Sequence, residues 1–138
     1  LENRAKRNGV KIIRTEKIRY SKALDKYAET ADRLLLDVPC SGLGVLRRNP
    51  DSKWKLSEEF VETLKELQWE ILTNYSKTVK VGGKMVYATC SILPSESEDQ
   101  ISKFIEKYGD TWTLTAAHRS SPSKDGFDGF YMALLERK

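Results

Sequence analysis

The chain of 138 residues carries a formal net charge of +4 at pH 7, and 39% of its residues are hydrophobic. This length and composition fit one globular α/β domain with a modest core. The absence of a run of about 18 apolar residues and of a signal-peptide pattern excludes a membrane span and export, so we expect a cytoplasmic protein. The first residue is Leu1 rather than Met, which suggests that an upstream part is missing.

Four elements are predicted in the first 40 residues: the end of a helix over 1–8, a strand over 10–13, a short helix over 21–31 and a strand over 34–36. The first helix stops at Gly9. The run Leu34-Leu35-Leu36 is continuously apolar, which predicts a central parallel strand that is buried on both faces. This strand ends at Asp37, and Pro and Gly residues mark 38–55 as a loop.

Five elements are predicted after this loop: a long helix from residue 57, a strand over 85–88, a helix after Pro94, a strand over 112–114 and a strand over 129–136. Ser57 is the predicted N-cap of the long helix, whose apolar residues recur at helical spacing from Phe60 to Val79. Gly82-Gly83 is expected to end it. The stretch Ser95-Glu96-Ser97-Glu98 matches a capping box that opens the next helix.

Strands and helices alternate along the chain, which predicts a doubly wound parallel sheet. The two closing strands follow each other without a helix, so we expect them to form an antiparallel hairpin at one edge. Two strand ends carry the cysteines of the chain, Cys40 and Cys90. Because consecutive parallel strands place their carboxyl ends at one edge of a sheet, both cysteines are expected to face one pocket.

Several interpretations of these cysteines remain open. A free cysteine at a strand end is often a small buried hydrophobic residue. Two cysteines are too few for a disulfide framework, and a reducing compartment disfavours a single Cys40–Cys90 bridge. The lone His118 does not complete a metal site with them, and we expect it to lie at the surface or in packing.

Positive charge gathers in two stretches of the sequence. Residues 1–22 contain Arg4, Lys6, Arg7, Lys11, Arg14, Lys17, Arg19 and Lys22. The second cluster contains Arg47, Arg48, Lys53 and Lys55. Basic side chains interleaved with an aromatic residue, here Trp54, suit a nucleic-acid backbone with a stacked base. A solvated surface is an equal alternative for the first cluster, and Trp54 more often anchors a loop than stacks on a base.

Three stretches of the sequence resemble motifs of the NOL/NOP/Sun family of RNA (cytosine-5) methyltransferases. DVPCSGLGVLRRNPDSKWK, residues 37–55, is similar to the fourth motif, and GGKMVYATCSILPSESEDQI, residues 82–101, is similar to the sixth. DGFDGFYMALLERK, residues 125–138, resembles the last hairpin. The resemblance implies an α/β, Rossmann-like methyltransferase sheet with an antiparallel C-terminal edge hairpin. Residues 1–138 would then be the C-terminal portion of the catalytic domain, incomplete at its N-terminal side.

The resemblance also implies a chemistry. C5 of cytosine is a poor nucleophile, and a thiolate that adds to C6 activates it toward the methyl group of S-adenosylmethionine. By the family pattern Cys90 is this nucleophile, and Cys40 assists removal of the C5 proton and product release. Asp37 and Pro39 would lie beside the methionine part of the cofactor. Ribosomal RNA is the expected substrate, and the residues expected to contact its phosphates are Arg47, Arg48 and Lys53.

The sequence departs from the family pattern at the cofactor site. The Gly-rich loop of the family is absent, and its ribose-binding acid would precede Leu1. Glu16 stands near the position where the family commonly has an adenine-contacting Asp. We therefore expect that residues 1–138 alone neither bind cofactor nor catalyse. The alternatives are a basic RNA-binding module without catalysis and a DNA (cytosine-5) methyltransferase, in which Cys40 would be the nucleophile but whose Glu-Asn-Val motif is missing.

Overall fold

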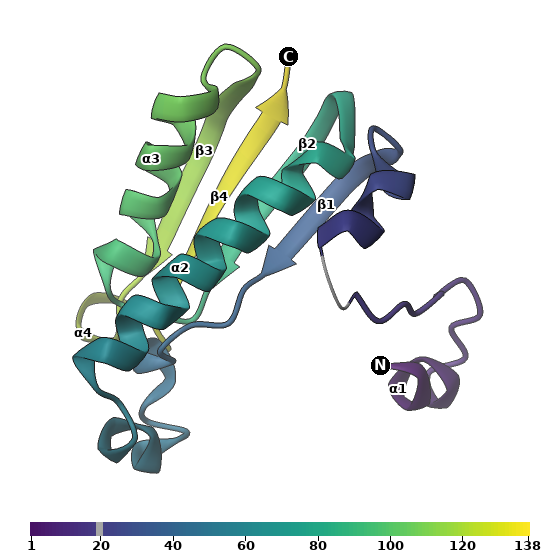
Figure 1. Ribbon diagram of the computed structural model, residues 1–138. Coiled ribbons are helices and arrows are strands. Elements are labelled where there is room, and N and C mark those ends of the chain that lie inside the picture. The colour runs from purple at the N-terminus through teal and green to yellow at the C-terminus, as the bar shows by residue number, and fades with distance from the viewer. Residues whose placement is uncertain (19–20) are drawn as a thin grey trace.

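The computed structural model describes residues 1–18 and 21–138. Its centre is an open four-stranded sheet with the strand order β1-β2-β4-β3. The strands are β1 (Ala31–Asp37), β2 (Val79–Thr89), β3 (Trp112–Ser120) and β4 (Phe130–Arg137). Strands β1 and β2 are parallel, whereas β4 runs antiparallel to both β2 and β3 (Figure 1). The predicted C-terminal hairpin is confirmed, with β3 at the edge of the sheet and β4 inserted beside β2.

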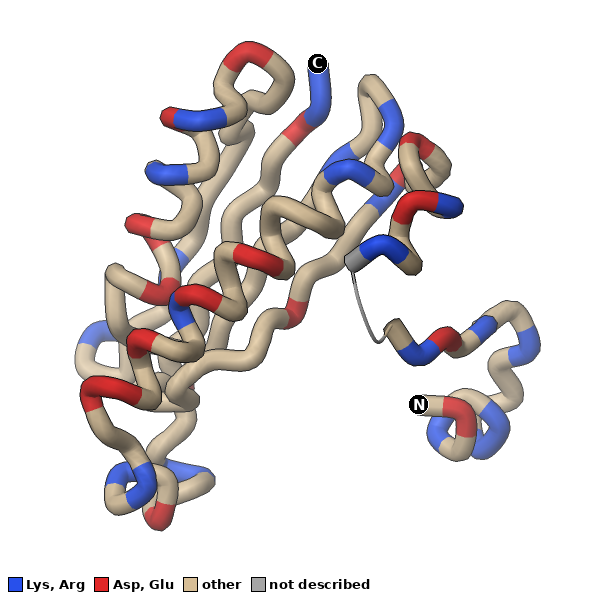
Figure 2. The backbone as a smooth tube through the Cα atoms, viewed as in Figure 1, with Lys and Arg blue, Asp and Glu red and all other residues tan. Residues whose placement is uncertain are grey.

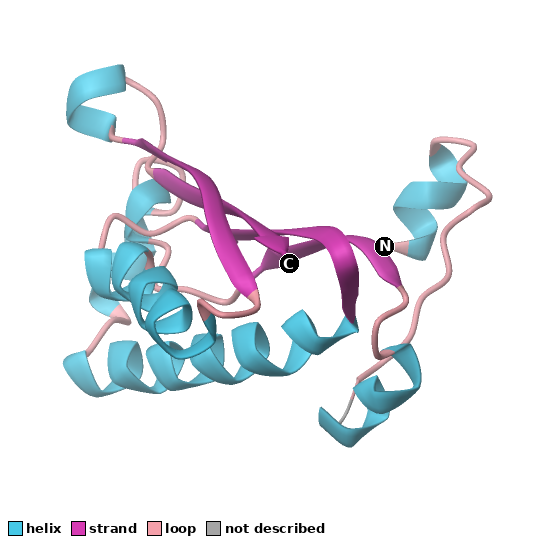
Figure 3. Cartoon of the chain, turned by 90° about the horizontal axis from the view of Figure 1, so that it is seen from above, coloured by secondary structure: helices cyan, strands magenta, loops and turns pink. Residues whose placement is uncertain are grey.

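Two long helices cover one face of the sheet. Helix α2 (Glu58–Tyr75) and helix α3 (Glu98–Tyr108) lie side by side on this face (Figure 1 and Figure 3). Ser57 is the N-cap of α2, as predicted, and its hydroxyl accepts a hydrogen bond from the Phe60 N–H at 3.1 Å. The core between helices and sheet draws on both layers, and its members include Leu36, Leu72, Met85, Tyr87, Ile101, Phe104 and Leu135.

The opposite face of the sheet remains largely open among the described residues. The side chain of Leu35 is 69% exposed there, and that of Met132 is 45% exposed. Successive side chains of a strand point to opposite faces, so Leu36 is only 4% exposed under the helices. The expectation that the strand over 34–36 is buried on both faces is therefore wrong, because the helices cover one face only.

The N-terminal segment contains helix α1 (Glu2–Arg7), and residues 10–13 do not form the predicted strand. β-branched residues favour an extended chain, but the backbone groups of a strand must pair with a neighbour. Among the described residues the sheet ends at β1, and Ile12 is 92% exposed. Arg19 of the basic N-terminal cluster lies outside the described residues.

Short helical turns connect the larger elements. They are η1 (Ser21–Tyr27), η2 (Leu43–Val45), η3 (Pro50–Trp54), η4 (Ser76–Thr78), η5 (Pro94–Glu96) and α4 (Pro122–Asp125). The 3-10 helix η1 takes the place of the longer helix predicted over 21–31. No described helix is both long and apolar enough to cross a membrane.

The end of α2 also differs from the prediction. The helix ends at Tyr75, and Gly82 and Gly83 lie inside β2 instead of closing the helix. The register of β1 against β2 shifts in this region, and Gly82 adopts a φ of 74° there. Glycine is as typical of an irregular point in a strand as of a helix end, which explains why the pair was misassigned.

Helix α3 follows Pro94 as predicted, but it begins without the capping box. Ser97 makes no capping hydrogen bond with its side chain, and its hydroxyl lies 3.1 Å from that of Thr89. Glu98 pairs with Arg119 of β3, and Glu96 is fully buried. The side chains of Ser97 and Glu98 therefore contact β2 and β3 rather than the free amides of the helix.

Candidate active site

Cys40 and Cys90 lie together at the carboxyl ends of two parallel strands, one after each strand. Strand β1 ends at Asp37 and β2 ends at Thr89, and Asp37 pairs with Ala88 (Figure 1). The two sulfur atoms are 3.1 Å apart, and both cysteines are free. This distance exceeds the ~2.05 Å of a disulfide bond. The structure thus brings into contact two thiols that are 50 positions apart in the sequence.

The contact makes the two thiols chemically unequal. A hydrogen bond from Cys40 lowers the pKa of Cys90 to about 7, against the opposing effects of burial and of the Asp37 carboxylate. The same hydrogen bond, together with burial, raises the pKa of Cys40 well above its ordinary value. Cys90 is therefore the thiol that ionises near neutral pH, while Cys40 stays protonated beside it. A thiolate is the nucleophilic form of cysteine.

Asp37 and Pro39, the two residues expected at the cofactor, differ in whether their polar groups already have partners within the protein. The Asp37 carboxylate is exposed at the end of β1 and makes no hydrogen bond or ion pair with another described residue. The Pro39 carbonyl accepts a hydrogen bond from Gln68 Nε2 at 2.9 Å and is thus used within the protein. The described residues contain no Gly-rich turn between a strand and a helix, so they fit one end of a cofactor rather than all of it.

A buried carboxylate that is absent from the predicted site residues links the two cysteine loops. Glu96 is 0% exposed and accepts hydrogen bonds from the Ser41 N–H at 2.8 Å and from the hydroxyls of Ser41 and Ser91 at 2.5 Å each. Gln68 Nε2 donates a further bond at 3.0 Å. Each serine directly follows a cysteine in the sequence, which is the signal that could have pointed to this cluster.

Strand β3 braces the loop of Cys90 through Arg119. The guanidinium donates to both carboxylate oxygens of Glu98, with Nε 2.6 Å from Oε1, and to the Ser91 carbonyl at 3.4 Å. This hydrogen-bonded ion pair lowers the pKa of Glu98 and raises that of Arg119. Because Ser91 follows Cys90, the hairpin and the candidate nucleophile are connected by a single side chain.

Arg47 and Arg48, predicted to contact RNA, gather around one buried carboxylate. Arg48 Nε lies 2.5 Å from Oδ2 of Asp128, although not at the angle of a hydrogen bond, and an Arg47 nitrogen lies 3.8 Å from Oδ1. Asp128 is 4% exposed, whereas each arginine side chain is 72% exposed. Figure 2 shows this basic loop beyond the N-terminal end of α2. One face of both guanidinium groups is thus free for an anion.

Lys53 and Trp54 form a separate exposed pair in η3. Lys53 Nζ lies 4.7 Å from the centre of the Trp54 ring, in a cation–π contact. The Trp54 side chain is 79% exposed, so the expectation that it anchors its loop is wrong. The pair thus presents an aromatic ring and a positive charge to solvent, the two groups that proteins use to bind single-stranded nucleic acid.

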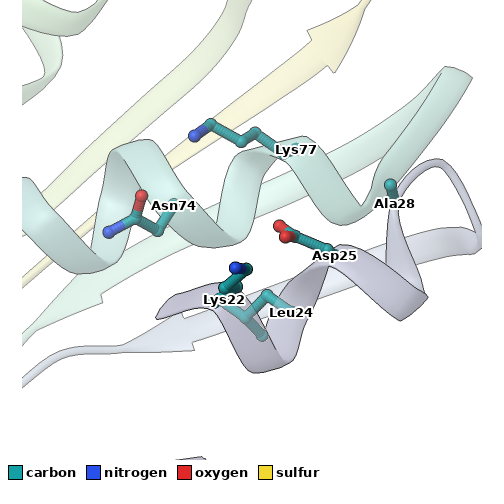
Figure 4. A pocket seen from close by; sticks show the side chains of 6 residues that line it. All are labelled: Lys22, Leu24, Asp25, Ala28, Asn74 and Lys77. Carbon is teal, nitrogen blue, oxygen red and sulfur yellow. The ribbon is translucent and has the colours of Figure 1, made fainter. Parts of the chain in front are cut away.

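The remaining features of the surface lie away from the cysteines. His118 is exposed on β3, as expected, and makes no contact with the candidate site among those described. A pocket between η1 and the C-terminal end of α2 is lined by Lys22, Leu24, Asp25, Ala28, Asn74 and Lys77 (Figure 4). It lies near the start of β1, whereas Cys40 follows the end of that strand. None of the predicted site residues lines it.

Comparison with known sequences identifies one family. The family model described as 16S rRNA methyltransferase RsmB/F matches residues 1–136. The chain is 45% identical over 116 residues to ribosomal RNA small subunit methyltransferase B of Shewanella oneidensis, which covers 78% of this chain and 27% of that protein. The corresponding protein of Vibrio cholerae is 41% identical over 115 residues, with 80% and 26% covered. The chain thus spans about a quarter of the length of these relatives.

Solved structures share the fold over almost the whole chain. PH0851 superposes with a TM-score of 0.92 at 32% identity and covers 98% of this chain and 33% of its own. NSun6 from Pyrococcus horikoshii, solved with SFG, superposes with a TM-score of 0.84 at 27% identity, with 99% and 37% covered. The four-stranded sheet is therefore part of a Rossmann-like methyltransferase fold.

Proposed function

We propose, from the premise that this chain belongs to the 16S rRNA methyltransferase RsmB/F family, that it is the C-terminal portion of the catalytic domain of an RNA (cytosine-5) methyltransferase. The single observation that carries the proposal is the pair of thiols 3.1 Å apart at the ends of β1 and β2. The names of the relatives favour ribosomal RNA as the substrate, which would place the reaction in the cytoplasm.

Cys90 is the proposed nucleophile. Its pKa of about 7 makes the thiolate available at neutral pH, because the Cys40 thiol donates a hydrogen bond to it. The sulfur adds to C6 of cytosine, which turns the C5–C6 double bond into an enamine and makes C5 nucleophilic. C5 then takes up the methyl group that S-adenosylmethionine supplies when it is bound.

Cys40 is proposed to act in the last step. Beside the Cys90 thiolate it stays protonated, because that contact raises its pKa. Once the Cys90 sulfur is bonded to C6 the neighbouring negative charge is gone, so Cys40 ionises more readily and releases its proton to water. The Cys40 thiolate then accepts the C5 proton, the C5–C6 double bond re-forms and Cys90 leaves as a thiolate. One proton per turnover thereby reaches the solvent, and the starting pair is restored.

The proposed cofactor is S-adenosylmethionine, and this chain would supply only part of its site. The exposed Asp37 carboxylate would face the methionine part, next to Cys40 and Cys90. The neighbour solved with SFG, an analogue of S-adenosylmethionine, supports this choice. Residues 1–138 alone are expected not to bind the cofactor, and isothermal titration of this segment with S-adenosylmethionine tests that. Micromolar binding would contradict it.

The basic residues are proposed to hold the RNA backbone. Arg47 and Arg48 present their free faces on one loop, and Lys53 lies with Trp54 in the same connection between β1 and α2. Cys40 lies near the start of this connection, so a phosphate held by the arginines would be near the target base. Phosphate contacts of this kind set register and orientation rather than sequence preference.

Covalent trapping on RNA tests the proposal in the full-length protein. With S-adenosylmethionine present, Cys40→Ala is expected to accumulate a protein–RNA adduct that resists denaturant, because the C6–sulfur bond forms but is not resolved. Cys90→Ala is expected to form no adduct, since it lacks the attacking sulfur. The double variant controls for adducts formed at other residues.

The outcomes of this experiment separate the competing functions. Adduct from Cys90→Ala but not from Cys40→Ala would make Cys40 the nucleophile, as in DNA (cytosine-5) methyltransferases. No adduct from any form, with tight RNA binding retained, would indicate a binding module without catalysis. Either result overturns the assignment of Cys90 and Cys40 given above.

A further inference from the structure

We propose that Glu96 is a positioning residue whose buried carboxylate holds the loops after β1 and β2 together and so sets the contact between the Cys40 and Cys90 thiols. Glu96 would not touch the substrate, because its carboxylate is enclosed by protein. Only the catalytic consequence of this role rests on the proposed function. The role itself concerns two thiols that are already in contact in the protein.

The Glu96 carboxylate joins the two loops directly. Oε2 accepts hydrogen bonds from the Ser41 and Ser91 hydroxyls, and Oε1 accepts one from the Ser41 N–H. The two serine hydroxyl oxygens are 3.1 Å apart, the same separation as the two sulfur atoms. Each serine is bonded through one peptide link to its cysteine. The loops therefore contact each other at two successive residues, first through the cysteine sulfur atoms and then through the serine hydroxyls.

Glu96 is itself held in place by residues of the helix and of the sheet. Gln68 of α2 donates from Nε2 to Glu96 Oε1 at 3.0 Å and to the Pro39 carbonyl at 2.9 Å. The Tyr87 hydroxyl of β2 donates to the Glu96 carbonyl at 2.8 Å. Pro39 directly precedes Cys40, so Gln68 holds the loop of that cysteine on its other side.

The free-energy cost of burying Glu96 also favours a positioning role. A buried carboxylate is costly unless hydrogen bonds satisfy it, and an apolar side chain in its place is often as stable. Glu96 contacts no cation among the described residues, and its negative charge acts to raise the pKa of Cys90. The charge therefore opposes ionisation of the nucleophile. The carboxylate instead fixes the position of the two loops relative to each other, because its two oxygen atoms bind donors from both loops at once.

Two substitutions separate the hydrogen bonds that Glu96 makes to the two loops from the effect of its charge. In Glu96→Gln the amide oxygen can accept from the Ser41 N–H and Gln68, and the amide N–H groups can donate to the serine hydroxyls, which accept as well as donate. This variant keeps the links and removes the charge. Glu96→Ala removes both. Glu106→Ala, on the exposed surface of α3, is the matched control for loss of a glutamate.

The measurement is the pH dependence of Cys90 alkylation by iodoacetamide in the full-length protein, followed by mass spectrometry of the Cys90 peptide. The natural protein and Glu106→Ala are expected to show a midpoint near the Cys90 pKa of about 7. Glu96→Gln should keep this midpoint or lower it. Glu96→Ala should move it toward the ordinary cysteine value of about 8.5, because the thiols separate. Methyl transfer should fall about 100-fold in Glu96→Ala, the scale of a displaced reacting group.

A double-mutant cycle distinguishes positioning from general loss of structure. Cys40→Ala alone should raise the midpoint, and adding it to Glu96→Ala should change nothing further, because the contact it removes is already lost. If Glu96→Ala does not fold, Ser91→Ala replaces it, since that change removes the link from Glu96 to the Cys90 loop, with the bond that the same hydroxyl accepts from the Leu93 N–H, and leaves the bonds of Glu96 to Ser41 and Gln68 in place. An unchanged midpoint in folded Glu96→Ala or Ser91→Ala overturns the proposal. The alkylation needs neither RNA nor cofactor, so its failure is distinct from failure of covalent trapping.

Discussion

Gly129 donates its backbone N–H to the Gly44 carbonyl at 2.8 Å, and the two main chains are too close for a side chain at either position. A Cβ added to Gly44 would lie 2.0 Å from the Gly129 oxygen, and one added to Gly129 would lie 2.6 Å from Ile92 Cγ2. Gly44 also donates to the Cys90 carbonyl at 2.9 Å. Three loops, those after β1 and β2 and the one before β4, therefore contact one another through main-chain atoms.

Gly44→Ala is expected to displace the Cys90 loop, because the new methyl group would meet backbone atoms that have no free space to move into. Overpacking of this kind costs about 1–3 kcal/mol in the free energy of unfolding, and the displaced loop should lower methyl transfer about 100-fold. Single-turnover methylation and denaturant unfolding check this. Gly82→Ala is the control: its Cβ would meet no atom within 4 Å, so only its φ of 74° is strained. Activity lost equally in both variants would contradict the steric explanation.

Cys40→Ala is expected to slow alkylation of Cys90 near neutral pH. The hydrogen bond from Cys40 lowers the Cys90 pKa to about 7, so the reactive thiolate is present above that pH and is lost as the pH falls through it. Without the bond the midpoint should rise toward about 8.5, and the rate at pH 7 should drop roughly tenfold. Cys40→Ser keeps a hydroxyl donor and should give an intermediate midpoint. Identical pH profiles for all three proteins would show that the thiol contact does not control ionisation.

Arg119→Met is expected to destabilise the protein by about 1 kcal/mol or less, because its ion pair with Glu98 is partly exposed. Arg119 lowers the pKa of Glu98 in the folded state, so this stabilisation is present at neutral pH and is lost as acid protonates Glu98. The difference in unfolding free energy between the two proteins should therefore shrink on acidification. Urea denaturation at pH 7 and at pH 3 measures it, and a difference that persists at the lower pH would mean that Arg119 acts through its contacts with the Ser91 carbonyl and the Tyr131 ring instead.

Joint replacement of Arg47 and Arg48 by Gln is expected to weaken RNA binding without lowering the rate of methyl transfer at saturation. Each lost phosphate contact should also reduce the dependence of log affinity on log salt concentration by about 1. Binding titrations at several salt concentrations test this. Lys103 and Lys107 on α3 provide the control pair, since they lie over Trp69 on the helical face. An equal loss from the control pair would assign the effect to net charge rather than to this loop.

The strands and helices next to the cysteines could be predicted because their signals are local. Ser57 and the helical spacing after it are enough to define the start of α2, and an apolar run before Asp37 is enough to place the end of β1, although not its start at Ala31. The strand predicted at 10–13 failed because a strand depends on a neighbour that its own residues do not specify. The placement of Cys40 beside Cys90 could be predicted because the carboxyl ends of neighbouring parallel strands lie side by side.

The polar cluster of the site could not be predicted from local signals. Glu96 follows a pattern that is typical of a helix start, yet its oxygens bind donors 55 and 28 positions away in the sequence. A buried carboxylate depends on such donors, and of those that Glu96 binds only Ser91 is near it in the sequence. In the same way, Arg47 and Arg48 could be predicted as basic residues of a loop, but their carboxylate partner Asp128 belongs to the closing hairpin.

The strand order also has a kinetic consequence. Pairing of β3 with β4 begins between Ser120 and Phe130, which closes a short loop, whereas contact between Cys40 and Cys90 requires closure of a segment of 50 residues. Loop-closure entropy grows with the length of the closed segment, so the hairpin is expected to form before the parallel crossover. In a partly folded chain that has formed only the hairpin, Cys90 would still be an ordinary thiol, and its acidity would appear only after β1 and β2 have paired.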